Sequence, residues 1–183
     1  MMDWLWKLDQ ELFYKIHVAF HNEWLRLLNK WISNSALGYV SGIILIALLF
    51  KEKTKRYSLI CIGSLLLLGV TRPFVMRYAD RMRPSNFDYA NPFECFYGNN
   101  SFPSGHTGTA FTLAVILFLL TRHGAYRKLG IWALVWALLV AFSRVYGGVH
   151  YPTDVIAGAC YGAMCSCIVY LVVKAKGDLP SQN

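Results

Sequence analysis

His150 and Asp154 stand four residues apart, with Pro152 between them. Proline suits the first turn of a helix, and side chains four residues apart on a helix share a face. A carboxylate beside an imidazole fixes the tautomer of the ring and leaves its other nitrogen free as a nucleophile or base. Arg144 offers a planar guanidinium that suits phosphate oxygens, and two glycines between Arg144 and His150 allow a tight turn around a ligand. The alternative is a hairpin loop with a surface His–Asp pair and an arginine that extends to the membrane surface.

A second cluster, Pro103-Ser104-Gly105-His106, directly precedes an apolar stretch. Ser104 suits the N-cap of a helix, and Gly105 lets a ligand approach the backbone closely. A helix start has unpaired N–H groups that bind anions such as phosphate, and His106 in the first turn can exchange a proton beside that anion. These residues alone leave an equal alternative, which is a capping turn with a histidine at the membrane interface.

Two arginines form the third cluster. Arg72 lies inside an apolar stretch, where a charge is costly and usually functional. Arg83 follows eleven residues later, which is about three helical turns, so on a helix the two side chains share nearly one face. The alternative is that Arg72 pairs with Asp80 or extends to the membrane surface.

The elements that position these clusters follow from the composition. Of 183 residues, 56% are hydrophobic and 15% are charged, whereas about 25% charged is usual in soluble domains. A water-soluble domain of this size needs more polar surface, and a disordered chain needs fewer apolar residues. We therefore expect an all-α integral membrane protein, a transmembrane helical bundle that forms a single domain over residues 1–183.

Five apolar segments match the length of about 20 residues that a bilayer requires. The predicted spans are Trp31–Phe50, Tyr57–Met76, Gly105–Thr121, Leu129–Ser143 and Pro152–Val173. Residues 1–30 carry a charge every few positions with apolar residues between them, which favours amphipathic helices in the interface over a cleaved signal peptide. A sixth span through about residues 11–33 is the alternative. Residues 175–183 are expected to form a cytoplasmic tail.

Basic residues gather in three short connections between the predicted spans. These connections hold nine of the 18 Lys and Arg residues against two acids, a net charge of +7 out of +8. The basic residues are Lys51, Lys53, Lys55, Arg56, Arg122, Arg127, Lys128, Lys174 and Lys176. The positive-inside rule makes these connections cytoplasmic and places the three clusters on the extracytoplasmic side. The charge thus reports topology, and no nucleic-acid partner is expected.

Cysteine spacing indicates neither a disulfide framework nor a metal site. Four of the five cysteines lie inside predicted spans, and only Cys95 is expected to face outward.

Together the three clusters resemble the signature of the type-2 phosphatidic-acid phosphatase superfamily, written K-x6-R-P, P-S-G-H and S-R-x5-H-x3-D. The second part matches at residues 103–106 and the third at residues 143–154, at every defined position. The resemblance covers about residues 30–174.

The first part of the signature departs from the family pattern. Arg83-Pro84 is present, but Met76 stands where the family has lysine. Arg72 is the candidate replacement, one helical turn further away, and the longer reach of arginine recovers part of that distance. Arg77 is the alternative, although its spacing from Arg83 puts it on another face.

The resemblance implies a double displacement without metal or other cofactor. His150 attacks phosphorus and forms a phosphohistidine, Asp154 orients the ring, and His106 protonates the leaving oxygen and then helps to activate water. The groups implied in phosphate binding are Arg72, Arg83, Ser104, Gly105 and Arg144. Arginines and a helix N-terminus supply the charge neutralisation that phosphoryl transfer needs.

The implied partners are a phosphorylated lipid and the bilayer that holds it, in the cytoplasmic (inner) membrane of a bacterium. Undecaprenyl pyrophosphate, phosphatidylglycerophosphate, phosphatidic acid and lipid A 1-phosphate all fit, with isoprenoid diphosphates and glycerophospholipids preferred. The oligomeric state stays open. The alternative function is a non-catalytic lipid-binding or transport protein with a relic site, which intact His106, His150 and Asp154 disfavour.

Overall fold

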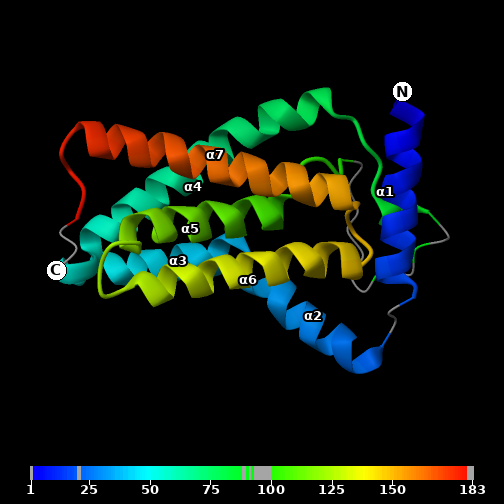
Figure 1. The fold of residues 1–183 in the computed structure, drawn as a ribbon, viewed down its shortest axis with the longest axis horizontal. Coiled ribbons are helices and arrows are strands. Elements are labelled where there is room, and N and C mark those ends of the chain that lie inside the picture. Colours follow the sequence, from blue (N-terminus) through cyan, green and yellow to red (C-terminus); the bar gives the residue numbers. More distant parts are fainter. Residues whose placement is uncertain (1, 20–21, 88–89, 91, 93–99, 181–183) are drawn as a thin grey trace.

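A computed structural model describes residues 2–19, 22–87, 90, 92 and 100–180. The described residues form helices α1 (Met2–His17), α2 (Glu23–Ser35), α3 (Gly38–Leu49), α4 (Glu52–Tyr78), α5 (Gly105–Thr121), α6 (Arg127–Tyr146) and α7 (Pro152–Ala175), with a short 3₁₀ turn at Pro84–Asn86. Helices α4 to α7 run along the length of the molecule, and α1 crosses one end of it (Figure 1). The predicted all-α class is therefore confirmed.

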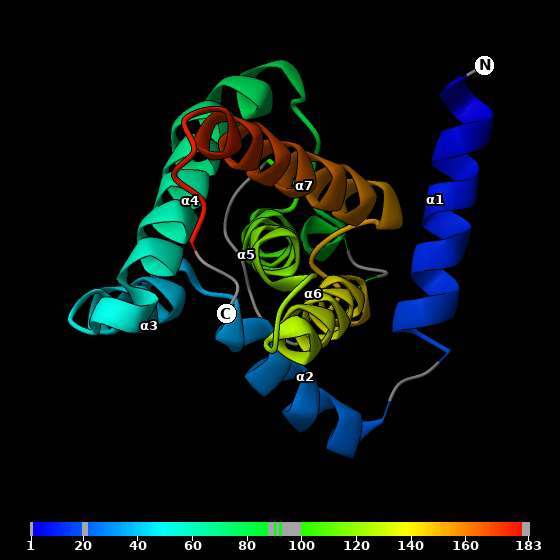
Figure 2. The same ribbon diagram turned by 60° about the vertical axis from the view of Figure 1, so that its left-hand side comes forward.

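Helix α5 lies at the centre of the bundle, surrounded by α4, α6 and α7 (Figure 2). Its backbone approaches α7 closely because glycines line their contact. A Cβ atom at Gly158 would lie 2.6 Å from the carbonyl oxygen of Ser104, and one at Gly162 would lie 3.0 Å from the Thr112 nitrogen. Small residues at such a crossing let two helices pack in the absence of a hydrophobic driving force. This packing holds the start of α5 against α7.

The two N-terminal helices bury polar side chains and expose apolar ones. On α2, Asn29 and Ser33 are buried, whereas Trp24 and Trp31 are 79% and 78% exposed. Residues Asp9, Phe13 and His17 of α1 are likewise buried, and the exposed side chains of that helix include Trp4, Leu5, Leu8, Leu12 and Tyr14. Such a pattern suits a helix whose outer face contacts lipid.

Three helices in the described part of the chain are long and apolar enough to cross a membrane, namely α4, α6 and α7. The pair α2 and α3 gives a fourth candidate that is bent by 51°, while α5 is apolar but only 17 residues long. The described residues thus provide three or four candidate spans, and the count of five stays a prediction.

The first predicted span, Trp31–Phe50, is wrong as a continuous helix. Helix α2 ends at Ser35, and the amides of Ala36 and Leu37 bond carbonyls three residues back, which tightens the last turn. The Ser35 hydroxyl bonds the Ile32 carbonyl at 2.6 Å and accepts the indole N–H of Trp136 in α6 at 2.8 Å. Local side-chain bonding and a contact from α6 therefore fix the break.

The basic connections gather at the end of the bundle opposite α1. The start of α4, the link between α5 and α6, and the end of α7 all lie there (Figure 1). The end of α6 and the start of α7 lie at the other end, beside α1, and α5 begins on the side facing that end (Figure 1). The predicted separation of basic residues from candidate site residues is thus present in the fold. Cys61, Cys160, Cys165 and Cys167 are free thiols, and Cys95 lies outside the described residues.

Candidate active site

The start of α7 holds the His–Asp pair. Asp154, in the first turn, accepts the N–H of Tyr151 through Oδ2 at 2.9 Å, and the same oxygen lies 3.6 Å from Nδ1 of His150. The hydroxyl of Ser101 donates to this Asp154 oxygen and lies 3.3 Å from Nδ1 of His150. Both members of the pair are buried. The carboxylate thus lies beside one nitrogen of the ring, although His150 stands before α7 and does not share a helix face with Asp154 as the spacing had suggested.

Arg83 determines which nitrogen of His150 carries the proton. Its Nη1 lies 3.0 Å from Nε2 of His150 and 3.3 Å from the Val149 carbonyl oxygen. A guanidinium can only donate, so Nε2 accepts and the proton resides on Nδ1, facing Ser101 and Asp154. This tautomer leaves a lone pair on Nε2, as a nucleophile requires.

The same surroundings keep the ring neutral. Burial lowers the pKa of His150 to about 4; the bond to Asp154 opposes this shift, and the charges of Arg83 and Arg144 add to it. The imidazole is therefore uncharged near neutral pH, so Nε2 keeps a lone pair, which accepts the Arg83 N–H in this structure.

The segment before α5 is joined to the His–Asp pair through its backbone. Ser104 is the N-cap residue of α5, as predicted, and its N–H donates to the Asp154 carbonyl at 3.0 Å. Its hydroxyl lies 3.0 Å from the Thr107 hydroxyl and does not cap the helix backbone. His106 is half-buried in the first turn of α5.

Arg72 reaches the same segment from α4. Its Nε and Nη2 lie 3.3 and 3.1 Å from the Pro103 carbonyl oxygen. Its guanidinium also packs against Gly105, where a Cβ atom would lie 2.9 Å from Cζ of Arg72. Arg77 as the replacement for the family lysine, and Asp80 as an ion-pair partner of Arg72, are both disfavoured because these two side chains are exposed. The structure therefore brings Arg72, and not Arg77, to the residues that follow Pro103.

Arg72, Gly105 and His106 border a cavity of about 360 Å³. Its other walls are largely apolar and come from α4, from the break between α2 and α3, and from α5: Ala36, Leu37, Gly38, Leu65, Leu68, Gly69, Pro73 and Thr109. Charged groups and a helix N-terminus thus lie at one side of an apolar pocket.

Arg144 is buried at the end of α6, and its Nη1 donates to the Ser33 hydroxyl of α2. The glycine turn that follows Arg144 packs against α1. Gly148 has a φ of +78°, and a Cβ atom there would lie 2.7 Å from Cε1 of His17 in α1. Helix α1 therefore packs against the turn that was expected to surround a ligand.

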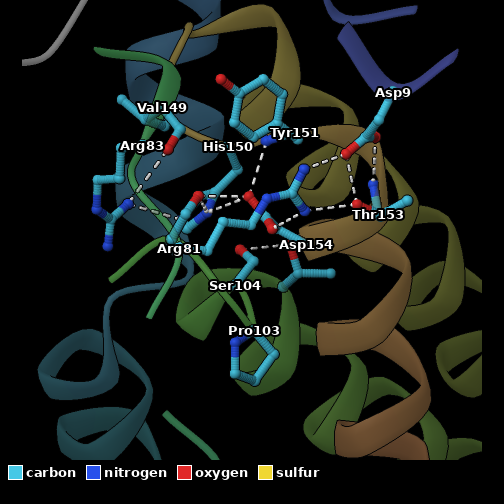
Figure 3. A network of polar contacts seen from close by, with 12 residues as sticks. Asp9, Arg81, Arg83, Pro103, Ser104, Val149, His150, Tyr151, Thr153 and Asp154 are labelled. Atoms are coloured by element: carbon cyan, nitrogen blue, oxygen red, sulfur yellow. Dashed lines mark hydrogen bonds and ion pairs between the residues drawn. The ribbon is translucent and has the colours of Figure 1, made fainter. Parts of the chain in front are cut away.

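Arg81, Asp9 and Ser101 contact the site and were missed from the sequence. Arg81 Nη1 donates to Asp154 Oδ1 and to the Thr153 hydroxyl, both at 2.6 Å, and its Nη2 donates to Asp9 (Figure 3). For Arg81, the available signal in the sequence was its position two residues before Arg83. Asp9 stands in α1, more than 70 residues before Arg81 in the sequence, and no motif surrounds it.

Comparison with known proteins supports one family. The PAP2 superfamily profile matches residues 58–178. An undecaprenyl-diphosphatase of Sulfolobus acidocaldarius is 30% identical over 181 residues, which cover 90% of this chain and 82% of that protein. A lipid A 4′-phosphatase of Bacteroides thetaiotaomicron is 33% identical over 120 residues, which cover 58% of this chain and 51% of that protein. The chain thus spans about half the length of this second relative.

A solved structure agrees with the sequence comparisons. The transmembrane PAP2-type phosphatidylglycerolphosphate phosphatase from Bacillus subtilis matches with a TM-score of 0.74 at 29% sequence identity, covering 93% of this chain and 87% of that one. The resemblance seen in the three motifs is confirmed, and the chain belongs to the PAP2 superfamily.

Proposed function

We propose that this protein is a membrane lipid phosphatase that works through a phosphohistidine on His150. One observation carries the proposal: Arg83 donates to Nε2 of a buried, neutral His150 whose other nitrogen faces Asp154 and Ser101. A ring in this state has its nucleophilic lone pair beside a cation that can bind a phosphate oxygen.

Two displacements follow from these groups. In the first, the Nε2 lone pair forms a bond to phosphorus, the bond to the lipid oxygen breaks, and His106 gives its proton to that oxygen. In the second, His106 takes a proton from water, the water oxygen bonds to phosphorus, and the bond to Nε2 breaks to release phosphate. Asp154 stabilises the charge that the His150 ring acquires in the first step.

The phosphate oxygens are assigned to groups on four segments. These groups are the guanidinium groups of Arg72, Arg83 and Arg144, the hydroxyl of Ser104 and the N–H of Gly105. Charge neutralisation by preorganised donors is the main catalytic requirement of phosphoryl transfer, so several arginines at a helix N-terminus can supply it. The same positive charges repel a divalent cation, and we propose a reaction without metal.

A lipid is the substrate that the surroundings favour. The apolar cavity beside Arg72 and His106 can hold the first part of a lipid chain while the headgroup contacts the arginines. The undecaprenyl-diphosphatase of Sulfolobus acidocaldarius, which aligns over 90% of this chain, favours an isoprenoid diphosphate. Phosphatidylglycerophosphate, phosphatidic acid and lipid A 1-phosphate are the other candidates.

The proposed topology places the active site on the extracytoplasmic side of a bacterial cytoplasmic membrane. It counts α5 and the bent pair of α2 and α3 as spans beside α4, α6 and α7, with α1 in the interface. The basic residues at the opposite end of the bundle support this orientation.

Phosphate release from a panel of the four lipids tests the proposal. We expect the purified, detergent-solubilised protein to release phosphate from at least one lipid, both with EDTA and without it, and vanadate to inhibit the reaction. His150→Gln should abolish release. A properly folded protein that releases no phosphate from any lipid would favour the non-catalytic alternative. Activity that EDTA removes and Mg²⁺ restores would contradict the metal-independent mechanism.

A further inference from the structure

Helix α1 inserts a carboxylate beside the candidate catalytic pair. Asp9 is 2% exposed, although most of the helix around it faces outward. Its Oδ1 accepts the N–H of Thr153 at 2.9 Å, and its Oδ2 accepts the Thr153 hydroxyl at 2.5 Å. A helix that only lay in the membrane interface would not need a buried charge, so this contact needs a further explanation.

Arg81 joins Asp9 to the active site. Its guanidinium bridges two carboxylates, with Nη2 donating to Asp9 and Nη1 donating to Asp154 Oδ1. The same group lies 4.9 Å from the centre of the Trp6 ring and 4.4 Å from that of Tyr151. Helix α1 therefore contacts Arg81 through the Asp9 carboxylate (Figure 3) and through the face of the Trp6 ring.

The bridge fixes the rotation of the Asp154 carboxylate. Arg81 occupies Oδ1, which leaves Oδ2 to Ser101, to the Tyr151 N–H and to Nδ1 of His150. Without Asp9, Arg81 loses one of its two carboxylate partners and can leave Oδ1. The carboxylate could then turn, and its alignment with the His150 ring would no longer be fixed.

We infer that Asp9 is a positioning residue for the catalytic pair, acting through Arg81 on Asp154. The inference rests on the proposed function, because it concerns how His150 becomes reactive. Asp9 contacts α7 and Arg81 and does not border the cavity beside Arg72. Loss of the Asp9 carboxylate should therefore lower kcat, because the His150 ring gains charge during the first displacement. The same loss should leave KM nearly unchanged.

Asp9→Asn tests this with little change of shape. The amide oxygen can still accept the Thr153 N–H, but the charge that holds Arg81 is gone. We expect kcat to fall about ten- to a hundredfold, the range for a lost charged hydrogen bond, with KM within about twofold. Glu11→Gln is the matched control, since it removes a carboxylate from an exposed position of the same helix.

Chemical rescue separates positioning from simple docking of α1. In Arg81→Ala, millimolar guanidinium should restore part of kcat by occupying the space between Asp9 and Asp154. In the double variant Asp9→Asn/Arg81→Ala the same guanidinium should restore little, because one of the two carboxylates is missing. If Asp9→Asn folds poorly, Arg81→Ala alone still tests the inference, because it leaves Asp9 in place and guanidinium that restores none of its kcat would overturn the bridge.

The outcomes are distinct. Wild-type protein that is inactive on every lipid overturns the proposed function and this inference with it. If the wild type is active, this inference alone is overturned by an Asp9→Asn kcat equal to that of Glu11→Gln, or by equal rescue of the single and double variants.

Discussion

Gly105→Ala offers a sharp test of where Arg72 lies. The guanidinium of Arg72 packs against Gly105, and an alanine Cβ would lie 2.9 Å from its Cζ and 3.0 Å from its Nη2. Ordinary carbon–carbon contact is about 3.5–4.0 Å, so the guanidinium must move by about 0.6–1.1 Å. Because it is the far end of a flexible side chain, the protein should fold while Arg72 is displaced.

The expected loss follows from that displacement. A charged hydrogen bond to phosphate contributes about 1.5–3 kcal/mol, so its complete removal in Arg72→Ala should lower kcat/KM about ten- to a hundredfold. A shift of about 1 Å in a catalytic group can lower the rate by as much as a hundredfold. Gly105→Ala should therefore approach the loss seen in Arg72→Ala.

A double-mutant cycle separates two explanations for such a loss. If the new methyl group acts by displacing Arg72, then Gly105→Ala should cost little in the Arg72→Ala background. If the methyl group instead collides with the phosphate, both backgrounds should lose the same factor.

The assay is phosphate release from the best lipid of the panel, with thermal stability measured in parallel. Gly42→Ala is the control, because a Cβ there meets nothing within 4 Å. The reasoning is refuted if Arg72→Ala keeps near-normal kcat/KM, since Arg83 and Arg144 would then suffice. Additive losses in the cycle would refute the proposed cause.

Three further predictions concern the protonation of His150, the hydrogen bond from Ser101 to Asp154, and the membrane topology. The pKa of His150 is lowered to about 4, so the ring stays neutral as pH falls through the ordinary pKa range of histidine. On the acid side of a pH–rate profile, kcat/KM should therefore fall only near pH 4, where the nucleophile becomes protonated. A fall in kcat/KM near pH 6.5 as the pH is lowered would contradict this. Ser101→Ala removes a donor to Asp154 and should lower kcat roughly ten- to a hundredfold without changing the fold, for a hydrogen bond to a charged group of about 1.5–3 kcal/mol; unchanged kcat would exclude the role. In a cysteine-free background, a cysteine at exposed Asn86 should react with an impermeant reagent outside the cell and one at Lys53 should not, and the reverse pattern would refute the topology.

Features that depend on local periodicity were predictable from the sequence. Pro152 and the apolar stretch after it place Asp154 in the first turn of α7, whereas His150 lies two residues before the helix. The start of α5 at Gly105 follows from the apolar stretch after it, and Ser104 takes the predicted N-cap position although its hydroxyl contacts Thr107 and not the helix backbone. The apolar composition predicted a helical membrane protein, because segments that span a bilayer must satisfy their own backbone N–H and C=O groups.

Contacts between distant segments were decided only by the tertiary structure. The exposed aromatic face of α1 and its buried Asp9 look from the sequence like one more amphipathic helix, because nothing near Asp9 indicates Arg81 as its partner. The break after Ser35 depends on Trp136 of α6, and the turn at Gly148 is shaped by His17 of α1. Periodicity records which residues share a face of one helix, whereas the partner on the other side of that face is determined by how the helices pack.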